Sequence, residues 1–66
     1  MKIWIAKDWY ATMAFLNKPT YAQNGEHKEW FGFRESAFER IIPQEIRDKI
    51  VEGEYIACEV NITEIK

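Results

Sequence analysis

The chain has few of the residues with which small domains are usually cross-linked. Its 66 residues include one cysteine, Cys58, and one histidine, His27. A single cysteine excludes an internal disulfide, and no cysteine and histidine are spaced as in a zinc site. A domain of this size buries only roughly 60% of the surface of its unfolded chain, so it is marginally stable alone. We therefore expect no metal and no cofactor, and we expect self-association or a protein partner to supply the missing stability.

Long apolar segments and basic clusters are missing as well. No run approaches the length needed to span a bilayer, and Lys7 and Asp8 end the apolar start of the chain too early for a signal peptide. These absences predict a single small domain, residues 1–66, in the cytoplasm and not at a membrane. The net charge is −2 and the nine lysines and arginines are not clustered, which disfavours nucleic acid as a partner.

Aromatic residues are abundant near the start of the chain. Eight of the ten lie in its first half: Trp4, Trp9, Tyr10, Phe15, Tyr21, Trp30, Phe31 and Phe33. Their segments are typical of β-strands, but with large apolar side chains on both faces. Ile3 and Ile5 alternate with Trp4, and residues 10–16 repeat this pattern, so we expect a first β-hairpin.

The dipeptide Asn24-Gly25 is the strongest local signal in the chain. Both central residues of a type I′ hairpin turn need positive φ, and this dipeptide tolerates that conformation best. With these two residues as the turn, Tyr21 lies opposite Lys28 and Thr20 lies opposite Glu29. The sequence therefore predicts a second hairpin, whose returning strand continues toward Phe33.

Helical signals follow in the second half. Ser36-Ala37-Phe38-Glu39 has the form of a capping box, which predicts a helix start at Ser36. Pro43 interrupts the apolar stripe, so we expect a short helical turn ending near Ile42 and a new helix at about 43–51 that stops at Gly53. A short strand over 38–42 is the alternative.

The clearest strand is the final one, in which alternate residues are apolar: Ile56, Cys58, Val60 and Ile62. This alternation is typical of a strand with one face buried. The elements together predict an α+β domain, in which a small antiparallel sheet of about four or five strands packs one face on one short helix at 43–51.

No residue pattern requires catalysis. Cys58 with His27 would be a nucleophile and base, but Cys58 shares its face with Ile56 and Val60, which favours a buried structural thiol. His27 and Glu29 share a strand face and offer two metal ligands, but two ligands are weak evidence and a solvated polar hairpin tip is the preferred interpretation. We assign no catalytic and no metal-binding residue, and we expect a protein that is not an enzyme.

The aromatic strands predict a binding surface instead. One helix of about eight residues cannot cover both faces of a sheet, so we expect Trp4 and Trp30 to be exposed together, and a contiguous apolar patch marks an interface. The expected binding residues are Trp4, Trp9, Tyr10, Tyr21 and Trp30. We interpret the chain as a non-enzymatic interaction module, either a homodimer or an inhibitor or adaptor of a cellular protein. The alternative is a small single-stranded nucleic-acid-binding protein that stacks bases on the same aromatics.

Scattered short motifs run through most of the chain: Ile5-Ala6-Lys7-Asp8, Lys18-Pro19, Trp30, Ile42-Pro43 and Glu59-Val60. In these positions the chain resembles small uncharacterised proteins carried by phages and mobile elements of Bacteroides-like bacteria. It departs from them in having Trp9-Tyr10 after the aspartate, where they tend to have a glycine-containing turn. The resemblance implies a compact accessory protein and carries over no active-site residue.

Overall fold

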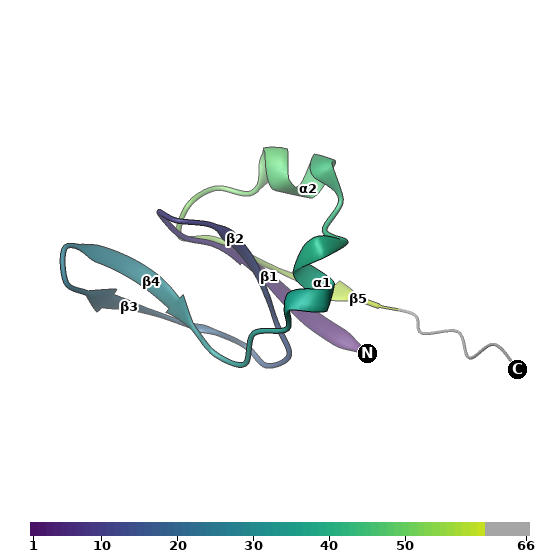
Figure 1. The fold of residues 1–66 in the computed structure, drawn as a ribbon, viewed down its shortest axis with the longest axis horizontal. Helices are drawn as coiled ribbons and strands as arrows, with labels where there is room; N and C mark the ends of the chain where they lie inside the picture. The colour runs from purple at the N-terminus through teal and green to yellow at the C-terminus, as the bar shows by residue number, and fades with distance from the viewer. Residues whose placement is uncertain (61–66) are drawn as a thin grey trace, which may run out of the picture.

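Five strands and two short helices make up the fold. The computed structural model describes residues 1–60 (Figure 1). The elements are β1 (Lys2–Lys7), β2 (Thr12–Phe15), β3 (Thr20–Asn24), β4 (His27–Phe31), α1 (Ser36–Arg40), α2 (Gln44–Lys49) and β5 (Tyr55–Glu59). The α+β class is therefore confirmed.

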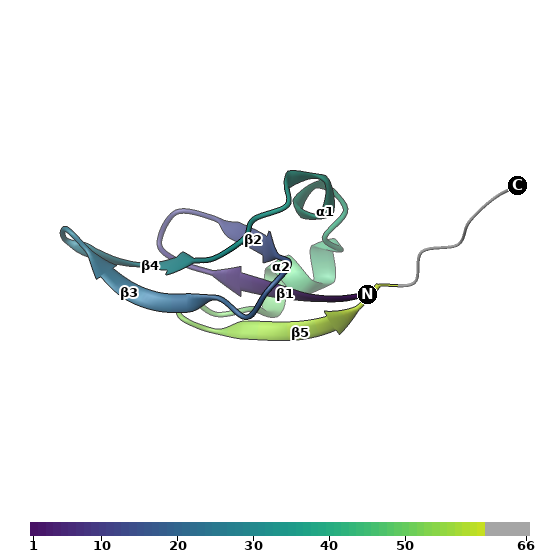
Figure 2. The same ribbon diagram turned by 90° about the horizontal axis from the view of Figure 1, so that it is seen from below.

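The strands form two antiparallel sheets and not the single sheet predicted. The first has the order β2-β1-β5, and the second is the β3–β4 hairpin. In the first sheet Ile5 lies opposite Ala14 on one side and Ile56 on the other. The β3–β4 hairpin projects beyond the end of this sheet that lies farthest from the N-terminus (Figure 2). In this sheet β1 is the central strand, and its pairing with β5 brings the start of the chain beside the end of the described residues.

The first hairpin is confirmed, and an aspartate closes its turn. The backbone N–H of Asp8 donates to the carbonyl of Ala11, and Asp8 Oδ1 accepts from the backbone N–H groups of Tyr10 (2.9 Å) and Ala11 (3.0 Å). A side chain that bonds the backbone two and three residues ahead stabilises a turn without glycine. The hydrogen bonds of the Asp8 side chain therefore stabilise this turn, which contains no glycine.

The second hairpin forms, but its predicted register is wrong. Asn24 pairs with His27, so Gly25 and Glu26 are the two turn residues, and Tyr21 lies opposite Trp30. Only Gly25 has positive φ (66°) in this turn, which is the requirement of a type II′ turn and not of type I′. The Tyr21 and Trp30 rings stack with centroids 4.6 Å apart. Lys28 still reaches Tyr21, as a diagonal neighbour 5.7 Å from the ring centroid.

The predicted short helical turn before Ile42 is a helix of its own, α1, so the fold has two helices where one was counted, and the alternative strand over 38–42 is wrong. The predicted capping box is also absent, because Glu35 is the N-cap of α1 and accepts from the N–H of Ala37. Pro43 lies at the N-cap of α2, one residue before the predicted position, and α2 ends at Lys49. Gly53, expected to stop this helix, instead has φ 88° in the turn before β5.

Each face of the three-stranded sheet has its own cover, with the helices on one side and the hairpin on the other (Figure 1). The helix side holds a core of Ile3, Ile5, Ala14, Ile42 and Ile50, against which Ile56, Cys58 and Val60 pack. The hairpin side holds Ala6, Met13, Phe15 and Trp30. The alternation predicted for β5 is therefore confirmed through Val60, and Ile62 lies outside the described residues.

Candidate functional site

The five aromatic residues expected at a binding surface do not form one exposed patch. Trp30 is only 8% exposed and donates its Nε1–H to the carbonyl of Lys7 at 2.9 Å. Trp4 and Tyr21 are half-buried beside it, whereas Trp9 and Tyr10 are 44% and 78% exposed. The prediction that Trp4 and Trp30 are exposed together is wrong, because the β3–β4 hairpin turns Trp30 inward against the sheet.

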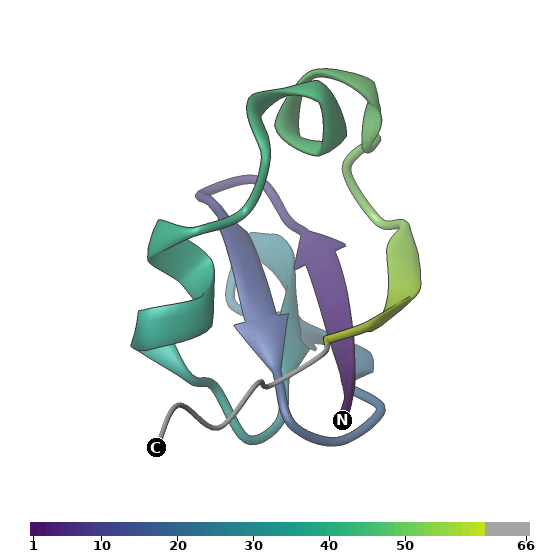
Figure 3. The same cartoon turned by 90° about the vertical axis from the view of Figure 1, so that its right-hand side faces the viewer.

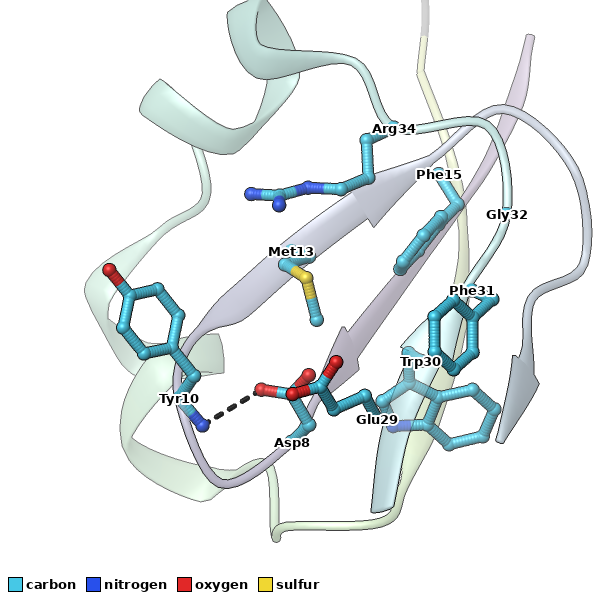
Figure 4. A pocket seen from close by; sticks show the side chains of 9 residues that line it. All are labelled: Asp8, Tyr10, Met13, Phe15, Glu29, Trp30, Phe31, Gly32 and Arg34. Carbon is cyan, nitrogen blue, oxygen red and sulfur yellow. Dashed lines mark hydrogen bonds between the residues drawn. The ribbon is translucent and has the colours of Figure 1, made fainter. Parts of the chain in front are cut away.

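A cleft opens between β2 and β4, on the hairpin side of the sheet (Figure 4). Its volume is about 260 Å³. The lining residues are Asp8, Tyr10, Met13, Phe15, Glu29, Trp30, Phe31, Gly32 and Arg34. Met13, Phe15 and Trp30 are buried, and the exposed rings of Tyr10 and Phe31 belong to the same lining. The cleft therefore combines an apolar interior with an aromatic and charged rim.

Asp8 contributes a buried carboxylate to this cleft. The residue is 5% exposed, and its Oδ1 takes both of the backbone hydrogen bonds that close the turn. No donor within residues 1–60 is assigned to its Oδ2. In the same part of the chain no side-chain oxygen or nitrogen is both sealed from solvent and unpaired. The second carboxylate oxygen of Asp8 is therefore available from the cleft.

Glu29 supplies the second carboxylate of the cleft. Its Oε1 accepts from Asn24 Nδ2 and its Oε2 accepts from Trp9 Nε1, both at 2.9 Å. The bonds from Asn24 and then Trp9 lower the pKa of Glu29, while the nearby charge of Asp8 acts in the opposite direction. Because its pKa is lowered, the Glu29 carboxylate is ionised at neutral pH. Its two hydrogen-bond donors are neutral and do not cancel that charge.

Arg34 lies at the upper rim and is held by a carboxylate outside the cleft. Its Nε and Nη2 donate to the two oxygens of Glu39 at 2.8 and 3.0 Å, and this pairing raises the pKa of Arg34. A two-point bond of this kind fixes the guanidinium plane. Glu39 is therefore the strongest partner of the rim arginine, and the charge of Asp8 lies close enough to interact with it more weakly.

The lowered pKa of Glu29 gives a testable pH dependence. A carboxylate with a lower pKa in the folded state contributes stability above its unfolded pKa of about 4.3, and this contribution is lost as the pH falls through the lower folded value. We expect the thermal midpoint of Glu29→Gln to depend less steeply on pH between pH 5 and pH 3 than that of the unaltered protein. Circular dichroism melts across this range measure the difference. Glu52→Gln, at an exposed position, is the control, and equal slopes for all three proteins would contradict the expectation.

The pairs considered for catalysis or metal binding have other roles. Cys58 packs against the isoleucines of the helix-side core and lies opposite Ile3. His27 lies beyond the other end of β1, where its ring stacks on Trp9 with centroids 4.0 Å apart. Within residues 1–60 no group of three or more histidine, cysteine, aspartate and glutamate residues is arranged to hold a metal ion. Cys58 and His27 therefore do not form a pair.

The two outer edges of the three-stranded sheet differ. Beside β2, the N–H of Leu16 donates to Phe33 and the carbonyl of Ala14 accepts from Glu35. On the β5 side, the N–H of Lys7 donates to the carbonyl of Glu54, and the N–H of Val60 donates to the carbonyl of Met1. The even-numbered residues of this segment therefore direct their backbone groups toward β1. Since alternate residues of an antiparallel strand face its partner, the backbone groups of Tyr55, Ala57 and Glu59 face away from β1. No element within residues 1–60 pairs with them, and β5 lies outermost in Figure 3.

Comparisons with known proteins gave no match: no family model fits the chain, and neither a curated protein nor a solved structure is similar to it. Among the described residues, neither helix has the length and apolarity needed to cross a membrane.

Proposed function

We propose that this protein is a non-enzymatic interaction module that forms a homodimer through the outer edge of β5. The observation that supports the proposal is the row of outward backbone groups on Tyr55, Ala57 and Glu59. Exposed strand edges pair readily with other strands, and natural monomers protect them with proline, bulges, lysines or covering segments. Residues 33–39 protect β2 in this way, whereas β5 has no proline, and its one outward charge is that of Glu59.

The edge is self-complementary about Ala57. When two copies of β5 pair antiparallel with Ala57 opposite Ala57, Tyr55 of each copy lies opposite Glu59 of the other. The central pair and the two symmetry-related outer pairs then each exchange two backbone hydrogen bonds. Lys18 Nζ lies 5.7 Å from the Tyr55 ring centroid, so its charge would lie near Glu59 of the second copy. The two sheets would then form one continuous six-stranded sheet with a two-fold axis, as expected for a homodimer.

Trp4 supports the same arrangement. It lies opposite Ala57 on the neighbouring strand, and its indole is half-buried in the single chain. Because the alanine side chain is small, the Trp4 rings of the two copies can lean over the junction toward each other. Dimerisation would thereby bury ring surface that the hairpin leaves open, and an indole gains stability in proportion to the apolar area it loses to water.

Binding of single-stranded nucleic acid is less well supported. Base stacking needs exposed rings beside basic residues. The exposed ring of Trp9 donates a hydrogen bond to Glu29, and Tyr10 borders the same cleft as the Asp8 carboxylate. These carboxylates would repel a phosphate backbone. An accessory role, which the resemblance to phage and mobile-element proteins implies, agrees better with a module that binds proteins.

Sedimentation equilibrium at several protein concentrations tests the proposed dimer. We expect a reversible dimer for the unaltered chain and a monomer for Ala57→Pro. Proline removes an outward N–H at an edge position, so the β1–β5 ladder keeps its hydrogen bonds. Ala57→Ser is the matched control and should remain a dimer. A monomeric unaltered chain, or an Ala57→Pro variant that folds and still dimerises, would exclude the β5 edge as the interface.

A further inference from the structure

We propose that the cleft between β2 and β4 binds an arginine side chain presented by a partner protein, with the guanidinium between the carboxylates of Asp8 and Glu29. This site is independent of the proposed dimer interface, because β2 and β5 are opposite edges of the sheet. The protein would then have one surface for self-association and another for a different protein. The groups that carry the inference all lie within the described residues.

The two carboxylates have the chemistry that a guanidinium requires. The Oδ2 of buried Asp8 has no assigned donor within residues 1–60, and it points into the cleft near Glu29 in Figure 4. Within residues 1–60 Glu29 accepts hydrogen bonds from the neutral groups of Trp9 and Asn24, and of the charges near it Asp8 opposes and His27 only weakly favours its ionised form. A planar guanidinium carries five N–H donors in a fixed fork, and it can donate to both carboxylates at once. An ionised acceptor forms its strongest hydrogen bonds with a charged donor.

The walls of the cleft favour an organic cation of limited size. Aromatic faces attract cations, and guanidinium groups stack on them. Tyr10, Trp30 and Phe31 supply such rings. The volume of about 260 Å³ lies below the roughly 300–1,000 Å³ of pockets for drug-sized ligands, so it suits one side chain. A Ca²⁺ ion takes roughly six to eight oxygen ligands, and within residues 1–60 no third carboxylate, histidine or cysteine is grouped with these two.

Arg34 determines the sign of the charge that the cleft accepts. Its guanidinium is bound to Glu39 through two nitrogens, which keeps it from turning down onto Asp8. It nevertheless borders the cleft and would repel an incoming cation. Removing its charge should therefore strengthen binding of an arginine side chain, whereas it would abolish binding of an anion. This opposite response separates the two kinds of ligand.

NMR titration with short blocked peptides tests the proposal. The probes are acetyl-Gly-Arg-Gly-amide and the same peptide with citrulline, a neutral residue of the same shape. We expect the arginine peptide to shift amide signals between Asp8 and Met13 and between Glu29 and Arg34, and the citrulline peptide to shift none of them. Asp8→Asn keeps an oxygen that can close the turn and removes the charge, and Glu29→Gln does the same in β4. Each variant should bind the arginine peptide about tenfold more weakly, and Arg34→Gln should bind it more tightly.

Several results would overturn the proposal. Equal shifts with both peptides would show that charge is not recognised, and unchanged affinity in Asp8→Asn and Glu29→Gln would exclude the carboxylates. Each variant is first compared with the unaltered protein by its signals outside the cleft, and two independent variants keep the test valid when one is unfolded. Free L-arginine binding as tightly as the peptide would indicate a small-molecule site and exclude a protein partner. None of these results depends on the oligomeric state.

Discussion

Replacing Phe15 with alanine is expected to lower the free energy of unfolding by about 3–5 kcal/mol. Among residues 1–60, Phe15 is the largest side chain that is completely buried, and it belongs to the hairpin-side core with Met13 and Trp30. Its loss removes the apolar contacts of a whole ring and leaves a cavity. A single core in a domain this small supplies on the order of 3–5 kcal/mol in all. The variant should therefore be largely unfolded at 25 °C.

Far-UV circular dichroism and urea denaturation measure this effect. Phe33→Ala is the matched control, because Phe33 is 71% exposed and a surface change of this kind costs within about 0.5 kcal/mol. Phe15→Leu keeps most of the buried volume and should remain folded, with a midpoint between those of the other two proteins. A folded Phe15→Ala variant with the stability of Phe33→Ala would mean that the hairpin-side core contributes little to folding.

Replacing Gly32 with alanine is expected to cost about 1–3 kcal/mol by overpacking. A Cβ at this position would lie 2.9 Å from Phe15 Cδ1, 3.0 Å from Asn17 Oδ1 and 3.4 Å from the Pro19 Cα. Phe15 is completely buried and packed in the hairpin-side core, and Asn17 Oδ1 is occupied by the N–H of Phe33 at 2.9 Å, so neither atom moves without losing contacts. The backbone after β4 must therefore shift, and with it one wall of the cleft.

A double-mutant cycle isolates the cause of this loss. In a Phe15→Leu background the nearest clash is relieved, so Gly32→Ala should cost less there than in the unaltered protein, and urea midpoints give the difference. Equal costs in both backgrounds would assign the loss to Asn17 or to the backbone. Gly25→Ala provides a contrast, since nothing lies within 4 Å of its Cβ and only its φ of 66° opposes the change.

Local patterns predicted the elements of this fold better than their pairing. The alternation in residues 2–16 predicted the first hairpin, but the part played by Asp8 was missed because an aspartate before two aromatics is no strong turn signal. Asn24-Gly25 located the second hairpin but not its register. The preference of this dipeptide for a type I′ turn is outweighed by the stacking of Tyr21 on Trp30 and by the bond from Asn24 to Glu29. Both contacts lie outside the two turn residues, so turn propensity alone does not predict them.

The site was only partly accessible to sequence reasoning. Tyr10 and Trp30 were predicted to be binding residues and both line the cleft, although Trp30 does so from the interior. Asp8, Glu29 and Arg34 were missed because single charged residues in strands and turns look like ordinary surface. Their proximity depends on the β3–β4 hairpin folding onto the open face of the sheet. The prediction assumed that a helix was the only available cover, and a hairpin rich in aromatic residues serves as well.

The central position of β1 has a consequence for how the chain acquires its structure. Its neighbour on one side follows after a tight turn, but its neighbour on the other side is β5, and the amino group of Met1 bonds to Glu59, 58 positions away. Such distant pairing slows folding, because a long loop must close before any contact repays the lost entropy. A nascent chain on the ribosome would carry β1 with one side bare until β5 emerged from the exit tunnel. Chaperone binding to that bare side would therefore be expected during translation and not afterwards.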